Sequence, residues 1–253
     1  MNNLDYLIEY LLEERKIKCD IPKNVDDKIA LWRSLVNQRM PNHISDEYLQ
    51  KEDEFLKEYF KSFDIVKVSE INTLNNSRIA IFKGDITKIE IDAIVNPASE
   101  MGLGCFVPLH NCLDNQITSY AGVRLRLEDK EIMDKIKVLE TGKVFITKGY
   151  NLKANYVIHT VGPIINDFVH DYQIEELKSC YINSLNLAKE NGIRTIAFPS
   201  ISTGIFNFPK DKAAEVALSV VKDYLKDDTF FEKIVFVCYS NVDYNFYINE
   251  SNK

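Results

Sequence analysis

The chain has 253 residues, of which 45% are hydrophobic and 27% charged, so it is long enough for one sizeable domain with a smaller appendage. Its formal net charge of −7, from 31 basic and 38 acidic residues, argues against a general binder of nucleic acid or anionic membranes. No apolar segment reaches the length of a membrane span and the N-terminus does not resemble a signal peptide, so we expect neither membrane insertion nor export.

Residues 1–63 are predicted to form an all-helical N-terminal extension. Apolar side chains repeat with a helical period near its beginning and again after Asn24, which is placed to start the second helix. Ser45 is placed to cap a third helix that ends near Phe60. The first glycine of the chain is Gly84, which favours packed helices over loops in this part of the sequence.

Residues 64–253 are predicted to form a second domain, in which strands and helices alternate. Apolar runs such as 93–95 lack the alternation of a half-exposed strand, which indicates strands buried on both faces. The pattern predicts an α/β fold with three α/β/α layers around a mixed, largely parallel sheet. The expected strands are 78–82, 93–95, 144–147, 156–161, 195–198 and 234–238, and the expected helices are 114–125, 173–190 and 210–225.

Three loops follow predicted strands, at 83–86, 96–99 and 199–206. In an open α/β sheet, ligands bind beyond the carboxyl ends of the strands, so we expect these loops to line one site. The third loop, Pro-Ser-Ile-Ser-Thr-Gly-Ile-Phe, has small residues that let backbone amides approach an anion, and a helix follows it. It lacks the Gly-Lys-Ser/Thr ending of a P-loop. A phosphate site and an ordinary strand-to-helix turn both remain open here.

Within that third loop, hydroxyl donors and a flexible residue occur together. Ser202 and Thr203 offer hydroxyl groups to a ligand, and Gly204 is expected to adopt a positive φ. Asp85, in the first loop, has two readings: it stabilises its turn, or it accepts a hydrogen bond from an exocyclic amine such as that of adenine.

A cluster of metal-ligating residues follows the second loop. Cys105, His110 and Cys112 fall within eight residues. Two thiolates and one imidazole suit zinc, and three protein ligands leave the fourth tetrahedral position for water or substrate, as in catalytic zinc sites. Residues two apart do not share a helix face, so the ligands must come from a loop. A structural zinc with a distant fourth ligand is the alternative.

The residues around this cluster also have two readings each. Asp114 either caps the helix that follows or acts with the metal. His159 lies inside a predicted strand and is expected to be a core histidine rather than a ligand. The other three cysteines, Cys19, Cys180 and Cys238, are expected to be buried. Because five is an odd number and no disulfide framework is evident, we expect a cytoplasmic protein.

Together, these loops resemble those of the macrodomain family, which binds ADP-ribose, and of its zinc-containing branch of protein-ADP-ribose hydrolases. The resemblance covers about residues 65–250, and the helical extension, with Leu-Trp-Arg-Ser-Leu-Val-Asn-Gln-Arg-Met-Pro at 31–41, resembles that branch as well. Its segments, in chain order, are Gly-Asp-Ile-Thr at 84–87 with Ile-Asp-Ala-Ile-Val-Asn at 91–96, Gly-Cys-Phe-Val-Pro-Leu-His-Asn-Cys-Leu-Asp-Asn at 104–115, Val-Ile-His-Thr-Val-Gly-Pro at 157–163 and Pro-Ser-Ile-Ser-Thr-Gly-Ile-Phe-Asn-Phe-Pro at 199–209.

The resemblance implies roles for individual residues. Asp85 would hold the adenine amine with Ile86 beside it, and the backbone from Ser202 through Thr203, Gly204 and Ile205 to Phe206 would bind the diphosphate, with Phe206 against the distal ribose. Cys105, His110 and Cys112 would hold one Zn²⁺ beside that ribose, and the catalytic group would comprise Asp114, which orients or activates water, with Asn96 and Ser99 near the ribose.

Three positions depart from the family pattern. Ser99 stands where related hydrolases usually carry a second asparagine, Pro97 replaces a common alanine, and Asn207 stands where glycine is frequent. A serine is shorter and has a single hydroxyl, so we expect it to affect positioning of the ribose, and hence the rate, more than binding.

The leading hypothesis is a zinc-dependent hydrolase that removes ADP-ribose from mono-ADP-ribosylated protein side chains, acting as a monomer without nucleic acid or membrane. One alternative is a non-catalytic ADP-ribose-binding module with structural zinc, and another is an O-acyl-ADP-ribose deacylase. A zinc-stabilised nucleic-acid binder is disfavoured by the acidic composition. The helical extension carries no chemistry that the sequence reveals; covering the sheet and shaping the contact with the substrate protein are both open.

Overall fold

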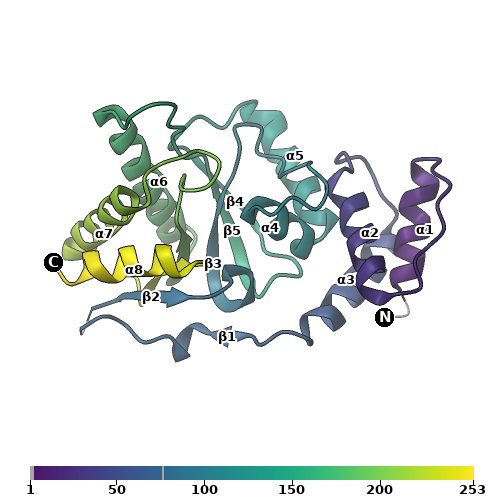
Figure 1. Ribbon diagram of the computed structural model, residues 1–253, viewed down its shortest axis with the longest axis horizontal. Helices are drawn as coiled ribbons and strands as arrows, with labels where there is room; N and C mark the ends of the chain where they lie inside the picture. The colour runs from purple at the N-terminus through teal and green to yellow at the C-terminus, as the bar shows by residue number, and fades with distance from the viewer. Residues whose placement is uncertain (1–2, 76) are drawn as a thin grey trace.

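The computed structural model describes residues 3–75 and 77–253, so Met1, Asn2 and Asn76 lie outside the description (Figure 1). Among these residues, no helix combines the length and apolarity needed to cross a membrane. The helices are α1 Leu4–Glu14, α2 Val25–Asn37, α3 Asp46–Phe60, α4 Leu113–Ala121, α5 Val123–Ile136, α6 Asp171–Glu190, α7 Lys210–Asp227 and α8 Asn241–Ser251. The strands are β1 Val66–Lys67, β2 Ile79–Lys83, β3 Ile89–Pro97, β4 Val144–Lys148, β5 Ala154–Thr160, β6 Thr195–Pro199 and β7 Lys233–Cys238.

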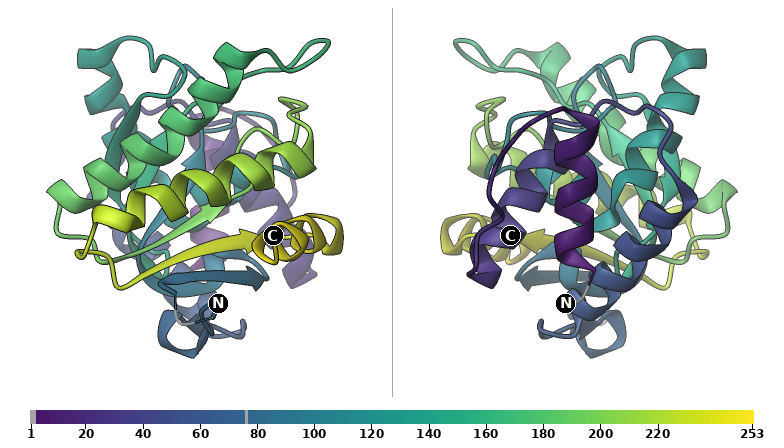
Figure 2. Two further views of the ribbon diagram at one scale, coloured as in Figure 1. Left: turned by 90° about the vertical axis from the view of Figure 1, so that its left-hand side faces the viewer. Right: turned by 90° about the vertical axis from the view of Figure 1, so that its right-hand side faces the viewer.

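The strands form one mixed sheet in the order β2-β7-β6-β3-β5-β4, with β1 paired to the start of β3. All pairs are parallel except β4 with β5, which run antiparallel. Helices α6 and α7 cover one face, and α4 and α5 lie on the other side with the N-terminal helices beyond them (Figures 1 and 2). The predicted α/β/α sandwich with a mostly parallel sheet is therefore confirmed.

The central strand β3 explains why its sequence lacks alternation. Ala93 and Val95 pack into the core beneath α6 and α7, whereas Ile94 packs into the core beneath α4. All three are fully buried, because both faces of the sheet are covered. The strand therefore ends at Pro97 with its carboxyl end fixed between two packed layers.

The predicted helix at 114–125 is in fact two helices. Gly122 separates α4 from α5 with φ 88° and ψ 176°, a conformation that an α-helix does not contain. The sequence pattern missed most of α5 because its buried face includes the charged residues Arg126 and Asp129. It missed α8 as well, of which only Tyr247 is buried.

The N-terminal extension has a core of its own. Trp32 of α2 is fully buried and meets Phe55 of α3 edge-on, with ring centroids 5.0 Å apart. The predicted helix starts are confirmed: the Asn24 side chain accepts hydrogen bonds from two backbone amides of α2, and Ser45 accepts one from Tyr48. Between α1 and α2, Cys19 is exposed, so its predicted burial is wrong, whereas Cys180 and Cys238 are buried as expected.

A buried carboxyl on α3 is one of the groups that join the extension to the sheet domain. Glu52 of α3 is fully buried, and its Oε2 accepts the backbone N–H of Val123, the first residue of α5, at 2.8 Å. Tyr48 donates its hydroxyl to Oε1 at 3.2 Å. A Cβ at Gly122 would lie 2.7 Å from Oε2, so this contact requires glycine there. Burial raises the pKa of Glu52 to about 7, although the hydrogen bond from Val123 opposes the rise.

This carboxyl predicts a pH dependence of stability. Between its ordinary pKa of 4.5 and about 7, the unfolded chain releases a proton that the folded chain keeps. The contribution of this carboxyl to the free energy of unfolding therefore falls as the pH rises through this window, by about 1.4 kcal/mol per pH unit, and is level above it. Glu52→Gln keeps the acceptor for Val123 and removes this loss. The free energy of unfolding of the variant minus that of the parent, measured by urea unfolding, should be more favourable to the variant at pH 8 than at pH 5. The same difference at both pH values would contradict the assignment.

Candidate active site and metal centre

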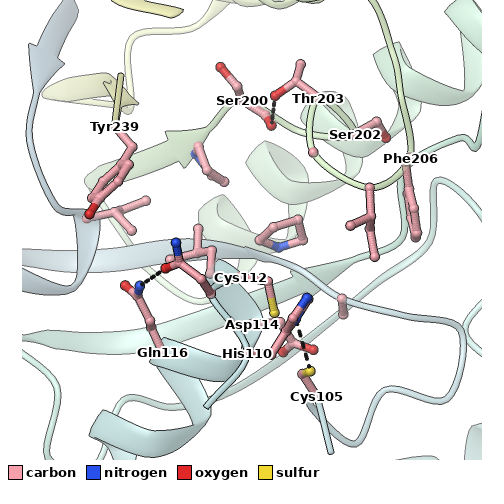
Figure 3. A pocket seen from close by; sticks show the side chains of 18 of the residues that line it. Cys105, His110, Cys112, Asp114, Gln116, Ser200, Ser202, Thr203, Phe206 and Tyr239 are labelled. Carbon is pink, nitrogen blue, oxygen red and sulfur yellow. Dashed lines mark hydrogen bonds between the residues drawn. The ribbon is translucent and has the colours of Figure 1, made fainter. Parts of the chain in front are cut away.

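A cavity of about 660 Å³ opens beyond the carboxyl ends of β2, β3, β6 and β7 (Figure 3). Its walls come from the three loops that the sequence singled out, at 84–86, 97–99 and 199–206, together with the segment 104–114. This volume is typical of pockets for small molecules and cofactors. The predicted convergence of these loops on one site is therefore observed.

The three metal-ligating side chains lie together on one wall of this cavity. The ligating atoms of Cys105, His110 and Cys112 are all within 4.8 Å of one another, and Cys105 Sγ is 3.6 Å from His110 Nδ1. Tetrahedral zinc, with bonds of about 2.3 Å to sulfur and 2.0 Å to nitrogen, separates such atoms by about 3.5–3.8 Å. The geometry and the donor set therefore fit a metal ion. All three side chains are half-buried and also line the cavity.

Residues 104–112, here called the metal loop, approach α4 so closely that the conformation of the loop is restricted. Gly104 has φ 75°, and a Cβ there would lie 2.5 Å from Thr118 Oγ1. At the other end of the loop, Cys112 is the N-cap of α4, and its Sγ accepts the amide of Asn115 at 3.4 Å. Burial and the neighbouring Cys105 raise the pKa of Cys112 to about 12, so in the absence of metal this thiol keeps its proton.

Asp114 lies beside the metal ligands and lines the cavity. Cys112, not Asp114, caps α4, so helix capping does not account for this carboxyl. Asp114 is 7% exposed, and Asn96 at the end of β3 donates its amide to Oδ1 at 2.7 Å. Burial raises the pKa of Asp114, and Asn96 and Arg126 oppose the rise. The carboxylate is thus held from the sheet and presented beside the three ligands.

A buried network extends behind Asp114. Asn96 is 1% exposed and also donates to His159 Nδ1 at 3.2 Å. Because an amide nitrogen only donates, His159 must carry its proton on Nε2, which lies 2.9 Å from Thr147 Oγ1. Burial lowers the pKa of His159 to about 3, and its ring stacks on Phe145 at 4.4 Å. The prediction of a core histidine is confirmed, but sequence reasoning missed that it supports Asn96.

The loop after β6 forms a cradle of free amides. Within the described chain, no protein acceptor receives the backbone N–H groups of residues 203–206. The loop is closed by Phe208, whose amide donates to the carbonyl of Ser202 at 3.0 Å. The positive φ expected at Gly204 is wrong: Ser202 with 64° and Asn207 with 57° hold these conformations, because the chain reverses at the two ends of the loop. Asparagine tolerates this region, which suits position 207.

The structure places the remaining predicted residues along the same cavity. Asp85 stabilises its own turn, as one of its two predicted roles requires. Its Oδ1 accepts hydrogen bonds from the amide and the hydroxyl of Thr87, and Lys88 Nζ lies 3.3 Å from Oδ2. It also lines the cavity. The other predicted residues among the lining are Ile86, Ser99, Ser202, Thr203, Gly204, Ile205 and Phe206, whereas Asn96 contacts the site through Asp114.

The lining also includes Lys210, Tyr239 and Asp243, which were not singled out from the sequence. Lys210, the first residue of α7, pairs with Asp243 of α8 at 2.8 Å, and Tyr239 follows the end of β7. Tyr239 is largely exposed at the cavity edge (Figure 3). Tyr239 directly follows a predicted buried strand. The other three loops were identified because they also follow predicted strands, so the same signal could have identified Tyr239.

An open, largely parallel sheet with a cavity at its carboxyl ends, an amide cradle and a thiol–imidazole cluster defines an α/β domain with a candidate ligand site and a candidate metal centre. A family profile described as "Macro domain" matches residues 95–217. The protein-ADP-ribose hydrolase of Treponema medium is 41% identical over 244 residues, which cover 94% of each chain.

Two solved macrodomains have the same fold. A mutant of the Oceanobacillus iheyensis macrodomain with ADPR is 34% identical, with a TM-score of 0.65, over 72% of this chain and 96% of that one. The Trypanosoma brucei macrodomain in complex with ADP-ribose is 27% identical, with a TM-score of 0.67, over 86% of this chain and 94% of that one. The chain therefore belongs to the macrodomain family, in its protein-ADP-ribose hydrolase branch, as its loop motifs predicted.

The cluster makes a direct prediction about metal content. The parent protein, purified without chelators, should contain about one zinc ion per chain by plasma mass spectrometry, because three ligands with this spacing suit that ion. Cys112→Ser removes one ligand and should lose the metal. Cys19→Ser, which removes an exposed thiol remote from the cluster in sequence, is the control and should keep it. Equal zinc in Cys112→Ser and the parent would place the ion elsewhere.

Proposed function

We propose that this protein is a zinc-dependent hydrolase that removes ADP-ribose from mono-ADP-ribosylated protein side chains. The observation that carries the proposal is that the metal-ligand cluster, Asp114 and the free-amide loop all line one cavity. The name of the Treponema medium relative and the ligands of the two solved macrodomains support the same substrate class.

In this proposal, residues 64–253 bind and process ADP-ribose, and residues 1–63 are an extension of that domain. The amides of 203–206 receive the diphosphate, since unpaired N–H groups next to the start of a helix favour an anion. Asp85 receives the adenine amine, with Ile86 beside the base. The distal ribose then lies between Phe206 and the metal ligands.

Zinc held by Cys105, His110 and Cys112 would supply a Lewis acid that polarises the substrate or lowers the pKa of water. Asp114 would orient the attacking water and accept its proton, because Asn96 occupies Oδ1 and Oδ2 has no hydrogen bond within the described residues. Water then adds across the bond between the distal ribose and the side chain, so that one product gains the hydroxyl and the other the proton.

In this proposal, Ser99 affects the rate at which ADP-ribose is released more than the affinity for ADP-ribose. It is exposed and lines the cavity next to the end of β3. Its single hydroxyl would make one contact to the ribose where an asparagine side chain makes more. The proposal also keeps the cytoplasmic location expected from the sequence, because cysteine ligands must stay reduced.

Asp114→Asn should separate catalysis from binding. The amide keeps an acceptor for Asn96 but accepts no proton, so release of ADP-ribose from a modified protein should fall by about 10²–10⁴-fold. Cys112→Ala should lower release similarly. Both variants should bind free ADP-ribose in calorimetry with affinities close to the parent's, because the amide loop is unchanged.

The parent protein decides between enzyme and binding module in the same assay. Binding of ADP-ribose without any release from the modified protein would identify a reader with structural zinc. Release that persists near the parent rate in both variants would reject the roles given to Asp114 and the metal. Faster turnover of O-acyl-ADP-ribose than of the modified protein would favour the deacylase.

A further inference from the structure

The N-terminal helices contact the metal loop through a buried amide on α2. Asn37 is fully buried, and its Oδ1 accepts the backbone N–H of Leu109 at 3.0 Å. Its Nδ2 donates to Ser119 Oγ on α4 at 2.9 Å. Leu109 directly precedes the ligand His110 and has φ 55°, a left-handed conformation that is uncommon for leucine and requires support from its surroundings. Asn37 supplies such support at the backbone of this residue.

Arg33, one turn earlier on α2, contacts the other side of the same ligand. Its Nη2 donates to the carbonyl of His110 at 3.3 Å and to Asn115 Oδ1 at 2.7 Å. Asn115 in turn donates its Nδ2 to the carbonyl of Val107 at 2.9 Å. Residues four apart on a helix lie on one face, so Arg33 and Asn37 act together. The amide of Leu109, one residue before the histidine ligand, and the carbonyl of His110 itself are thus held from the extension.

Arg126 of α5 joins the end of α2 to the first metal ligand. Its Nη1 donates to the carbonyls of Val36, Asn37 and Arg39, each at 2.9 Å, at the end of α2. Its Nη2 donates to the carbonyl of Cys105 at 3.2 Å. One buried guanidinium therefore donates to carbonyls at and just beyond the end of α2 and also fixes the backbone of the first ligand, Cys105.

We propose that α2 is the outer support of the metal centre, with Arg33 and Asn37 as positioning residues for His110. The inference rests on the proposed metal site and assigns a role to the helical extension within it. Cys112 is held at the start of α4 and Cys105 by Arg126, so His110 is the ligand whose position depends on Arg33 and Asn37. Groups behind the ligands that fix their orientation contribute to metal affinity, typically 10–100-fold each.

The test uses the full chain and measures zinc affinity by competition with a chromophoric chelator. Arg33→Ala and Asn37→Ala should each bind zinc roughly 10–100-fold more weakly than the parent. Two controls should bind as the parent does. Gln38→Ala changes an exposed side chain at the end of α2 that bonds only within that helix, and Ile8→Val weakens the core of the extension without touching the loop.

Each outcome supports or overturns the inference. Circular dichroism sets a temperature at which all variants are folded. If Arg33→Ala does not fold, Arg33→Lys is a milder variant, because lysine keeps the positive charge but has one nitrogen where arginine has three. Affinities of Arg33→Ala and Asn37→Ala within twofold of the parent's would overturn it, as would an equal loss in Ile8→Val, which would indicate general destabilisation. A parent that binds no zinc would instead reject the proposed function itself.

Discussion

The hydrogen bond between Asn96 and Asp114 is the contact on which the site depends. It ties the carboxyl end of the central strand β3 to the first turn of α4 at 2.7 Å, and the whole metal loop is the connection between these two elements. Because Cys112 caps α4 and Asp114 lies two residues later, fixing the start of this helix fixes one ligand and the carboxylate together. The sheet, which is buried on both faces, thereby sets the position of the chemistry.

Buried polar groups, in addition to apolar packing of α3 against α4 and α5, connect the rest of the molecule to this contact. Glu52 caps α5 from the extension, and Arg126 on α5 returns to the end of α2 and to Cys105. Such groups are costly to bury unless their partners are all present, so each makes a specific arrangement of the helices preferable to others. We regard the extension and the sheet domain as one structural unit around the metal loop for this reason.

The sequence predicted the parts of the fold that follow from periodicity and local signals. The buried strands and the capping residues Asn24 and Ser45 were of this kind, as was the metal cluster, which depends only on spacing. It missed most of α5, whose buried face includes Arg126, and it placed the positive φ at Gly204 rather than at Ser202 and Asn207. Nor did it reveal that His159 supports Asn96 or that Asn37 contacts Leu109. These contacts join residues 63 and 72 positions apart, so they depend on tertiary packing that no local pattern encodes.

Anomalous X-ray diffraction at the zinc absorption edge, on crystals grown with ADP-ribose, tests the central claim most directly. We expect one strong peak bonded to the sulfur atoms of Cys105 and Cys112 and to a ring nitrogen of His110, next to the terminal sugar of the bound nucleotide. A crystal with ADP-ribose in the cavity and no anomalous peak at these three side chains, or a peak remote from that sugar, would contradict the account.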